Sequence, residues 1–177
     1  MRCTRVRFFQ DSDSVACSRI GNASWRQVLA RYYDEATIDH FQKYHEPARY
    51  IQISQQYFSH SRILVAETDG VVLGFCLLGD LQNPKGEGEI YQLFVDPNHM
   101  REGIGTLLHT TAERVAKENG RTKLRCDSAI HPETIRFWEK CGFESRGEKV
   151  RKYPDGFDAK VVYMEKQLSQ TDQVPNT

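Results

Sequence analysis

The sequence lacks an excess of charge of either sign. Lys plus Arg number 24 and Asp plus Glu also number 24, so the formal net charge is zero. A protein that binds nucleic acids generally needs a basic surface that displaces phosphate counterions. The balanced charge therefore argues against a nucleic-acid-binding protein.

Long apolar runs are also absent. The longest apolar stretch, residues 71–78, contains a glycine and falls far short of the ~20 residues that a membrane-spanning helix needs. Arg2, Arg5 and Arg7 are similar to the start of a signal peptide, but residues 8–13 are not the apolar run that should follow. We therefore expect a cytoplasmic protein that is neither secreted nor inserted into a membrane.

The cysteines and histidines form no recognisable metal or disulfide pattern. The five cysteines are odd in number and include no Cys-x-x-Cys, which indicates reduced thiols in a cytoplasm. The six histidines include no His-Glu-x-x-His and no tight cluster. We therefore expect no metal site.

What the chain does have is enough material for one hydrophobic core. With 177 residues and 39% hydrophobic residues, it fits one domain. We expect that domain to cover residues 1–168, and we expect the polar segment 169–177 to be a disordered tail.

The segment 14–60 is polar, aromatic and mostly helical in pattern. Its first helix is predicted from one apolar face, a second is predicted over 34–44, and a third after Pro47 carries Tyr50, Ile51, Tyr57 and Phe58. The residues on the first face have the spacing i, i+3, i+4 and i+7; they are Trp25, Val28, Leu29 and Tyr32.

The rest of the chain predicts strands. Residues 4–9 alternate as an edge strand, and Asp69-Gly70 is a two-residue hairpin turn between strands at 62–67 and 71–78. A strand at 89–95 completes an antiparallel meander. A helix from Ile104 to Gly120 then leads to a strand at 122–126, which implies a parallel crossover. A short helix from Pro132 and two final strands, at 143–150 and 159–165, end the pattern.

The loop 100–105 carries the chemical signal. Gly103-Ile104-Gly105 lacks the Gly-Lys-Ser/Thr of a Walker loop and the third glycine of the dinucleotide fingerprint. However, the loop lies between a strand and an amphipathic helix, where backbone N–H groups and the helix dipole converge on an anion. Glycines allow the backbone to approach a bulky pyrophosphate.

Three segments resemble the GNAT acetyltransferase superfamily. Residues 90–97 with the loop 100–105 and Leu107-Leu108 are similar to its acetyl-CoA-binding core, whose loop is Arg/Gln-x-x-Gly-x-Gly/Ala. Residues 131–143 are similar to its Asn-x-x-Ala-x-x-Phe-Tyr-x-x-x-Gly-Phe, and residues 65–75 to its central hairpin. The resemblance covers about 62–165.

This resemblance implies an α+β fold of the GNAT type, with a mixed, mostly antiparallel central sheet that is splayed between strands 4 and 5 and flanked by helices. It makes 14–60 a variable lid over the acceptor. The implied activity is direct transfer of an acetyl group from acetyl-CoA to a primary amine of a small molecule or a peptide N-terminus. The residues it implies for binding acetyl-CoA are Phe94, Val95, Met100, Arg101, Glu102, Gly103, Ile104, Gly105, Thr106, His131, Phe137 and Trp138.

The resemblance also implies a backbone donor for the thioester oxygen, at Phe94 or Val95. Three residues depart from the family pattern: Met100 replaces Arg/Gln, Glu102 stands where a basic residue is frequent, and Trp138 replaces a tyrosine that protonates the departing thiolate. An acid beside a pyrophosphate is unfavourable unless it faces solvent. Tyr153, Tyr91 or water would then replace the missing tyrosine as proton donor.

Glu89 is the candidate general base. Alternation along the strand predicts that it shares a face with Tyr91, Leu93 and Val95, and it precedes Gly103 by 14 residues. Family members with a fourth-strand glutamate base have the same spacing. The alternative is a solvated glutamate like its neighbour Glu87, and both interpretations stay open.

Other assignments also stay open. His131 lies at the motif's Asn position near the cofactor, although a helix cap before Pro132 is the slightly favoured interpretation. Tyr32, Tyr33 and Tyr44 form either an acceptor wall or ordinary core, and Cys141 is expected to be a packed residue. A non-catalytic acyl-CoA sensor and a protein-modifying acetyltransferase remain alternatives, and a homodimer is compatible with the sequence.

Overall fold

The computed structural model describes residues 3–56 and 61–169. The predictions for Tyr57, Phe58 and most of the C-terminal tail lie outside these residues. The helices and strands, in chain order, are β1 (Thr4–Phe8), α1 (Ser14–Ser24), η2 (Trp25–Leu29), α2 (Glu35–Gln42), α3 (Pro47–Gln56), β2 (Arg62–Thr68), β3 (Val71–Gly79), β4 (Glu87–Val95), α4 (Ile104–Glu118), β5 (Lys123–Ser128), α5 (Pro132–Lys140), β6 (Glu144–Lys152) and β7 (Asp158–Gln167), with short 3₁₀ turns at η1 (Asp11–Asp13), η3 (Lys43–His45) and η4 (Pro97–His99).

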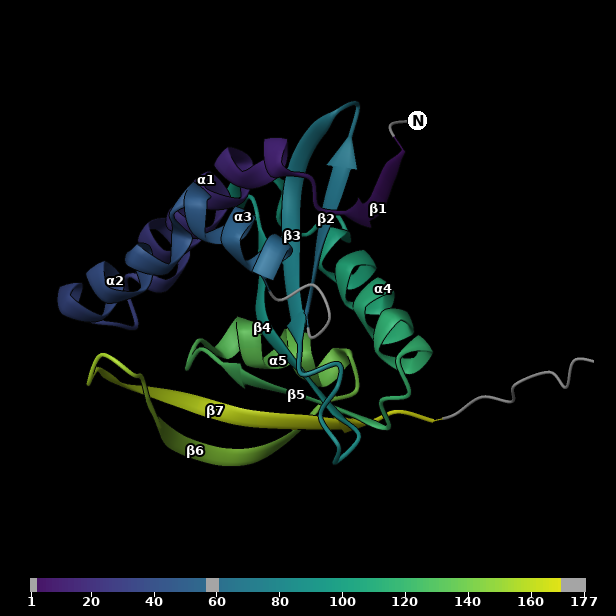
Figure 1. Ribbon diagram of the computed structural model, residues 1–177. Coiled ribbons are helices and arrows are strands. Elements are labelled where there is room, and N and C mark those ends of the chain that lie inside the picture. Colours follow the sequence, from purple (N-terminus) through teal and green to yellow (C-terminus); the bar gives the residue numbers. More distant parts are fainter. Residues whose placement is uncertain (1–2, 57–60, 170–177) are drawn as a thin grey trace, which may run out of the picture.

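The strands form one seven-stranded sheet in the order β1-β2-β3-β4-β5-β7-β6. Neighbouring strands are antiparallel except for β4 and β5, which are parallel, as the crossover through α4 requires. The edge position predicted for the first strand is confirmed. In Figure 1, α1 and α3 cover one side of β2–β4 and α4 covers the other.

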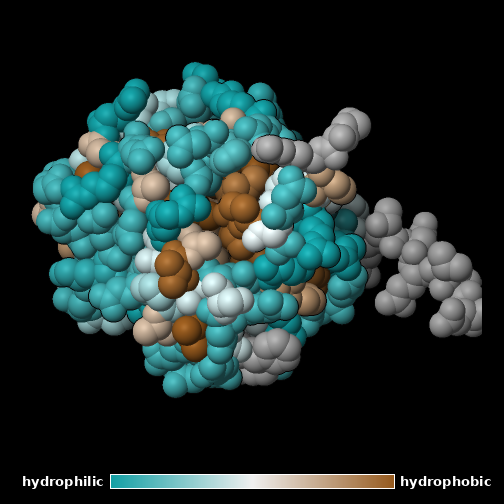
Figure 2. All heavy atoms as spheres, turned by 90° about the horizontal axis from the view of Figure 1, so that it is seen from above, coloured by the Kyte–Doolittle hydropathy of each residue, from teal (hydrophilic) through white to brown (hydrophobic). Residues whose placement is uncertain are grey.

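Alternation along the strands divides the core between the two faces of the sheet. Leu64 and Leu78 pack on the α4 side, whereas Val65 and Leu77 pack on the side of α1 and α3. This is the period of two expected for strands that are buried on both faces. Seen from above, the surface is mostly hydrophilic, and apolar side chains gather in a recess near its centre (Figure 2).

The predicted hairpin turn is confirmed. Asp69 and Gly70 both have positive φ angles, 51° and 79°, as the two central residues of a type I′ turn must. Asparagine, aspartate and glycine tolerate this conformation best, which explains why the pair was a reliable signal.

A β-bulge in β4 changes which residues share a face. Leu78 pairs with Ile90 and Leu77 pairs with Gln92, so Tyr91 is an extra residue on β4. A bulge inserts one residue and so reverses the alternation beyond it. Every later residue of β4 therefore faces the side opposite to the one that simple alternation from Glu89 predicts.

The predicted common face of Glu89, Leu93 and Val95 is therefore wrong. Leu93 and Val95 pack against the core on the α4 side, whereas Glu89 pairs with Gly79, two residues beyond Leu77 on the α1 side. Tyr91 remains on the face of Glu89, because its ring covers Gly79 so closely that an added Cβ would lie 2.3 Å from it.

The N-terminal helices build a small core of their own. The predicted helix around Trp25 begins at Ser14 and ends in a π-helical turn, η2. Tyr32 lies beyond this turn, so the prediction of one helical face from Trp25 to Tyr32 is wrong. Trp25 and Leu29 are buried with Ile38 of α2. Among the described residues, no helix combines the length and apolar composition needed to cross a membrane.

Candidate active site

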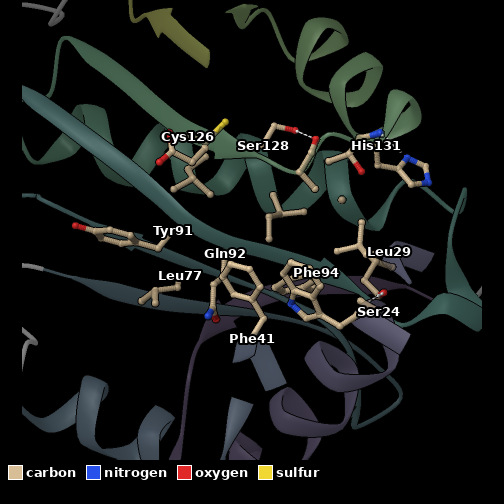
Figure 3. A pocket seen from close by; sticks show the side chains of 18 of the residues that line it. Ser24, Leu29, Phe41, Leu77, Tyr91, Gln92, Phe94, Cys126, Ser128 and His131 are labelled. Atoms are coloured by element: carbon tan, nitrogen blue, oxygen red, sulfur yellow. Dashed lines mark hydrogen bonds between the residues drawn. The ribbon is translucent and has the colours of Figure 1, made fainter. Parts of the chain in front are cut away.

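A cavity of about 1100 Å³ lies between β4 and β5 and continues beneath the N-terminal helices. The two strands pair only from Glu87 to Ile90 on β4 and from Lys123 to Cys126 on β5, and they separate beyond that point. In Figure 3, Cys126, Ser128 and His131 line one wall, and Tyr91, Gln92 and Phe94 of β4 line the other. The parallel pair therefore opens into a slot in the sheet.

The N-terminus of α4 forms one end of this cavity. Arg101 and Gly103 have positive φ angles, 68° and 83°, and Gly103 is the N-cap of the helix. The first intrahelical bond here is from the Leu107 N–H to the Gly103 oxygen, at 3.0 Å. The N–H groups of the first turn thus have no helical acceptor, and Ile104, Gly105 and Thr106 line the cavity. Such an end attracts an anion.

The two glycines of the loop are needed for different reasons. A Cβ on Gly103 would meet nothing within 4 Å, so its left-handed backbone is what favours glycine there. A Cβ on Gly105 would lie 3.2 Å from the ring of Phe137. Gly105 thus permits α5 to pack closely against α4.

Of the residues predicted to bind acetyl-CoA, all but Glu102 line the cavity. The side chain of Glu102 is 53% exposed and its carboxylate lies 3.3 Å from His99 Nδ1. Arg101 lines the cavity and pairs with Glu133 at 2.9 Å. Glu102 therefore does not place an acid in the cavity wall, which was the unfavourable arrangement that the sequence suggested.

His131 caps α5. Its Nδ1 accepts hydrogen bonds from the N–H groups of Glu133, at 3.1 Å, and Thr134, at 3.3 Å. Burial lowers the pKa of the imidazole, so the neutral ring carries its proton on Nε2. The helix-cap interpretation is confirmed, and the ring also lines the cavity.

The backbone of β4 presents alternate N–H groups to the slot. Asp96 N–H donates to the Leu73 oxygen of β3 at 2.8 Å, and ladder bonds of an antiparallel pair recur at every second residue. Phe94, which pairs with Phe75, therefore directs its N–H towards β3. Val95 directs its N–H away from β3, and its carbonyl accepts from Ser24 Oγ at 3.3 Å. Of the two expected donors, Val95 faces the slot.

Trp138 is part of the core. It is 5% exposed and makes edge contacts with Phe143, at 5.1 Å between ring centroids, and His109, at 6.3 Å. This burial agrees with the interpretation that the indole packs rather than reacts.

Glu89 lies outside the large cavity. It is 6% exposed and borders a smaller cavity of about 380 Å³ together with Arg125, Asp127 and Arg151. Arg151 Nη1 donates to Glu89 Oε1 at 2.9 Å, and Arg125 Nη2 lies 2.9 Å from Oε2. Both carboxylate oxygens therefore already have a cationic partner. The sequence did not indicate either arginine, because β5, which carries Arg125, and β6, which carries Arg151, reach Glu89 only through the fold.

The end of the cavity beneath the N-terminal helices is aromatic. Trp25 stacks on Phe41 with ring centroids 4.3 Å apart, and Phe41 meets Tyr153 edge-on at 5.4 Å. His40 of α2 stacks on Phe157 at 3.8 Å, so α2 lies against the turn between β6 and β7, as Figure 1 shows. Tyr153 was named as a proton donor from the sequence, but its place in this wall beside Phe41 was not predicted.

The tyrosines and cysteines of the cavity keep their protons. Burial raises the pKa of Tyr153 to about 12 and also raises that of Tyr91, whose hydroxyl donates to Asp80 at 3.1 Å. Burial raises the pKa of Cys126 as well. All five cysteines are free thiols, and among residues 3–56 and 61–169 no three His, Cys, Asp or Glu side chains are grouped to hold a metal.

Comparison with known proteins identifies the family. The model of the acetyltransferase (GNAT) family matches residues 24–143. The chain belongs to the GNAT acetyltransferase family. A curated relative, the IAA acetyltransferase of Azospirillum brasilense, is 32% identical over 108 residues, which are 60% of this chain and 68% of the relative.

Solved structures share the fold of this acetyltransferase. The PaiA N-acetyltransferase of Thermoplasma acidophilum in complex with coenzyme A has a TM-score of 0.73 at 20% identity, covering 93% of this chain and 99% of that one. A GCN5-related N-acetyltransferase of Rhodopseudomonas palustris has a TM-score of 0.78 at 22% identity, covering 95% and 98%. The yncA protein of Salmonella typhimurium, solved with acetyl-CoA, has a TM-score of 0.67 at 21% identity, covering 95% of each chain.

These findings confirm the expected fold class: an α+β fold with a mixed, mostly antiparallel sheet that splays between β4 and β5 and is flanked by helices. They also confirm the enzyme class. The protein is an acetyltransferase of the family that uses acetyl-CoA as its cosubstrate.

Proposed function

We propose that this acetyltransferase moves the acetyl group of acetyl-CoA directly to a primary amine of a small molecule or a peptide N-terminus. The observation that carries the proposal is the single cavity that joins the N-terminus of α4, the β4–β5 slot and the aromatic end. Two substrates entering from opposite ends would meet at the slot. In this proposal residues 1–168 form one domain, and 14–60 is its acceptor lid.

The residues at the α4 end fit the pyrophosphate of acetyl-CoA. The free N–H groups of Gly103, Ile104, Gly105 and Thr106 supply donors and the positive end of a helix dipole. Arg101, Arg136 and Lys140 add cationic side chains to the cavity wall. This set of donors compensates for Met100 in place of the family's Arg/Gln.

At the reacting end, the Val95 N–H supports the transfer. It faces the slot from a fixed strand, so it would bind the thioester oxygen as negative charge grows there. Phe137 lies close to Gly105 and borders the cavity with His131 and Phe94. We propose that these side chains enclose the pantetheine arm and exclude water.

Direct transfer suits the protonation states of the cavity. The neutral amine attacks the carbonyl carbon, the C–N bond forms, and the C–S bond breaks to release a thiolate. A Cys126 acetyl-enzyme is disfavoured, because burial raises the pKa of its thiol and the thiolate is the nucleophile. A thiol of pKa ~8.5 can leave as the anion. Tyr153, which keeps its proton, is proposed to donate a hydrogen bond to the departing thiolate.

Glu89 remains the proposed base, acting through water. Its carboxylate shares a face with Tyr91, which lines the acceptor end. Because Arg125 and Arg151 contact both of its oxygens, we expect a bridging water to carry the proton from the amine.

A panel of primary amines, each incubated with acetyl-CoA while free thiol is measured, tests the proposal. Thiol release that requires an amine, with an N-acetyl product seen by mass spectrometry, supports it. Calorimetric binding of acetyl-CoA without thiol release for any small amine or peptide contradicts it and indicates an acyl-CoA sensor. Transfer to protein lysines alone would indicate a protein-modifying enzyme.

A further inference from the structure

Four of the charged side chains at the aromatic end of the cavity are already paired. Asp80 binds Arg125 at 2.7 Å, Asp127 binds Arg151 at 2.8 Å, and Asp155 lies 3.4 Å from His40. The guanidinium contacts neutralise Asp80, Asp127 and Arg151, whereas Asp155 contacts an imidazole whose pKa is lowered by burial. None of the four groups is therefore ready to bind a charged ligand without losing a partner.

Arg49 is the exception. It lies in the first turn of α3 and lines the cavity. Its guanidinium sits over the ring of Tyr44, 4.5 Å from the centroid, and it has no ion pair or side-chain hydrogen bond within the described part of the chain. Stacking on an aromatic ring orients a guanidinium but uses none of its five N–H donors.

Aromatic and aliphatic side chains share this end of the cavity with Arg49. Phe41, Tyr44, Ile53, Leu77 and Tyr153 line the same end of the cavity. An oriented, permanently charged guanidinium beside aromatic rings is suited to a planar anion attached to an apolar body, because guanidinium and carboxylate form two parallel hydrogen bonds.

We propose that Arg49 binds a carboxylate of the acceptor, so that the acceptor is an amino acid with an apolar or aromatic side chain. This assignment rests on the proposed function. The carboxylate lies at Arg49, the side chain packs on the aromatic wall, and the amine points to the slot beside Val95. An acceptor of this kind is a small molecule. In a peptide, the carboxyl group of the first residue is part of an amide bond and carries no charge.

The test compares free amino acids with their primary amides, which keep the amine and the side chain and lose the negative charge. Because loss of the carboxylate also lowers the pKa of the amine, kcat/KM is compared at equal concentrations of the neutral amine. The wild-type protein should acetylate the acids with the higher kcat/KM. Arg49→Met should lower kcat/KM for the acids roughly 10- to 100-fold, which is the scale of hydrogen bonds to a charged group, and leave the amides unchanged. Arg49 is exposed, so the variant should keep the wild-type melting temperature.

Lys43→Met is the matched control. It removes the same charge from the neighbouring turn, and Lys43 is exposed and does not line the cavity, so the preference for acids should persist. Equal rates with acids and amides, or a preference that survives Arg49→Met, would overturn the assignment while leaving the proposed function intact. Absence of thiol release with every amine would instead refute the proposed function.

Discussion

At the α4 end of the cavity, the wall includes a short continuous stretch of chain around Gly103, Gly105 and Thr106, whose first-turn N–H groups have no helical acceptor. At the aromatic end, it consists of side chains from segments far apart in the sequence, such as Phe41 and Tyr153. A backbone site is encoded by a few local residues, whereas a side-chain site is assembled by the fold. This difference explains why the cosubstrate can be predicted from the sequence and the acceptor cannot.

The largest expected effect concerns Glu89, which borders the smaller cavity. Glu89→Gln should lower kcat roughly 10²–10⁴-fold, the usual contribution of a general base, and most strongly at low pH, where the amine is charged. Acetyl-CoA affinity, measured by calorimetry, should not change.

Glu87→Gln is the control for this substitution. Glu87 is on the same strand and pairs with Lys123 at 2.7 Å, but it lines neither cavity. Its variant should retain the wild-type rate. If the pH–rate profile of Glu89→Gln matches that of the wild type, the base lies elsewhere or solvent suffices.

The proposed acetyl-CoA site at the α4 end can be disrupted by substitutions that disturb its backbone. Gly103→Val places a branched side chain at φ 83° in the proposed phosphate path, where it would keep the phosphate from the N–H donors. Acetyl-CoA affinity should fall roughly 10²-fold, since hydrogen bonds to a charged group contribute about 1.5–3 kcal/mol each. Gly120→Val is the control, because Gly120 follows the other end of α4 with φ 73° and open space around it. It should suffer similar strain and bind acetyl-CoA normally. Similar losses of acetyl-CoA affinity in the two variants would contradict a pyrophosphate site at Gly103.

Gly105→Val disturbs the same end by a different route. Its added side chain would press on Phe137, which lies 3.2 Å from the position of the Cβ. We expect weaker acetyl-CoA binding in a folded protein. Calorimetry that shows unchanged affinity would remove Gly105 from the site.

A smaller effect is expected at Trp138. Because the indole N–H is too weak an acid to protonate a thiolate, Trp138→Phe should keep turnover within about tenfold of the wild type, or roughly 1.4 kcal/mol of barrier. Trp138→Tyr should not reduce turnover. The melting temperature of Trp138→Phe should fall, since the ring is buried. A larger loss of turnover with intact acetyl-CoA binding and stability would show a catalytic role.

The remaining prediction concerns how the free energy of unfolding depends on pH. Burial lowers the pKa of His45, at the lid, to about 4 and that of His109, in α4, to about 4. The unfolded chain, with a pKa of ~6.5, binds protons in this window that the folded chain does not. The free energy of unfolding should therefore decrease as pH falls from about 6.5 towards 4, by up to ~1.4 kcal/mol per pH unit for each histidine.

Urea unfolding at several pH values measures this slope. His45→Gln and His109→Gln should each remove one histidine's share, so the pair reports separately on the lid and on α4. A slope that both variants leave unchanged would mean that neither imidazole stays neutral in the folded protein.

Much of the fold followed from short-range patterns. Asp69-Gly70 predicted its turn, and the apolar face from Ile104 to Ala116 predicted α4, because both depend on local backbone preferences. The bulge at Tyr91 has no local signal in the sequence. It arises from the pairing of β4 with β3, and it overturned the prediction for the face of Glu89.

The candidate site also has parts that the sequence predicted and parts that it did not. The loop at Gly103 and the cap at His131 were predicted from residues a few positions apart. The partners of Glu89 were not, since Arg151 lies 62 residues away and meets it only because β6 folds towards β4. Side chains that converge across the fold leave no spacing to detect in one sequence.

Because β4 separates from β5, hydrogen exchange along β4 should report whether a ligand occupies the slot. Phe94 and Gln92 donate their amide hydrogens to β3, whereas those of Leu93 and Val95 face the slot. In the empty protein, hydrogen exchange with deuterated water should be slow at Gln92 and Phe94 and fast at the residues between and after them. Acetyl-CoA, when bound in the slot, should slow the fast positions alone, so that a single strand records both the rigidity of the sheet and the arrival of the ligand.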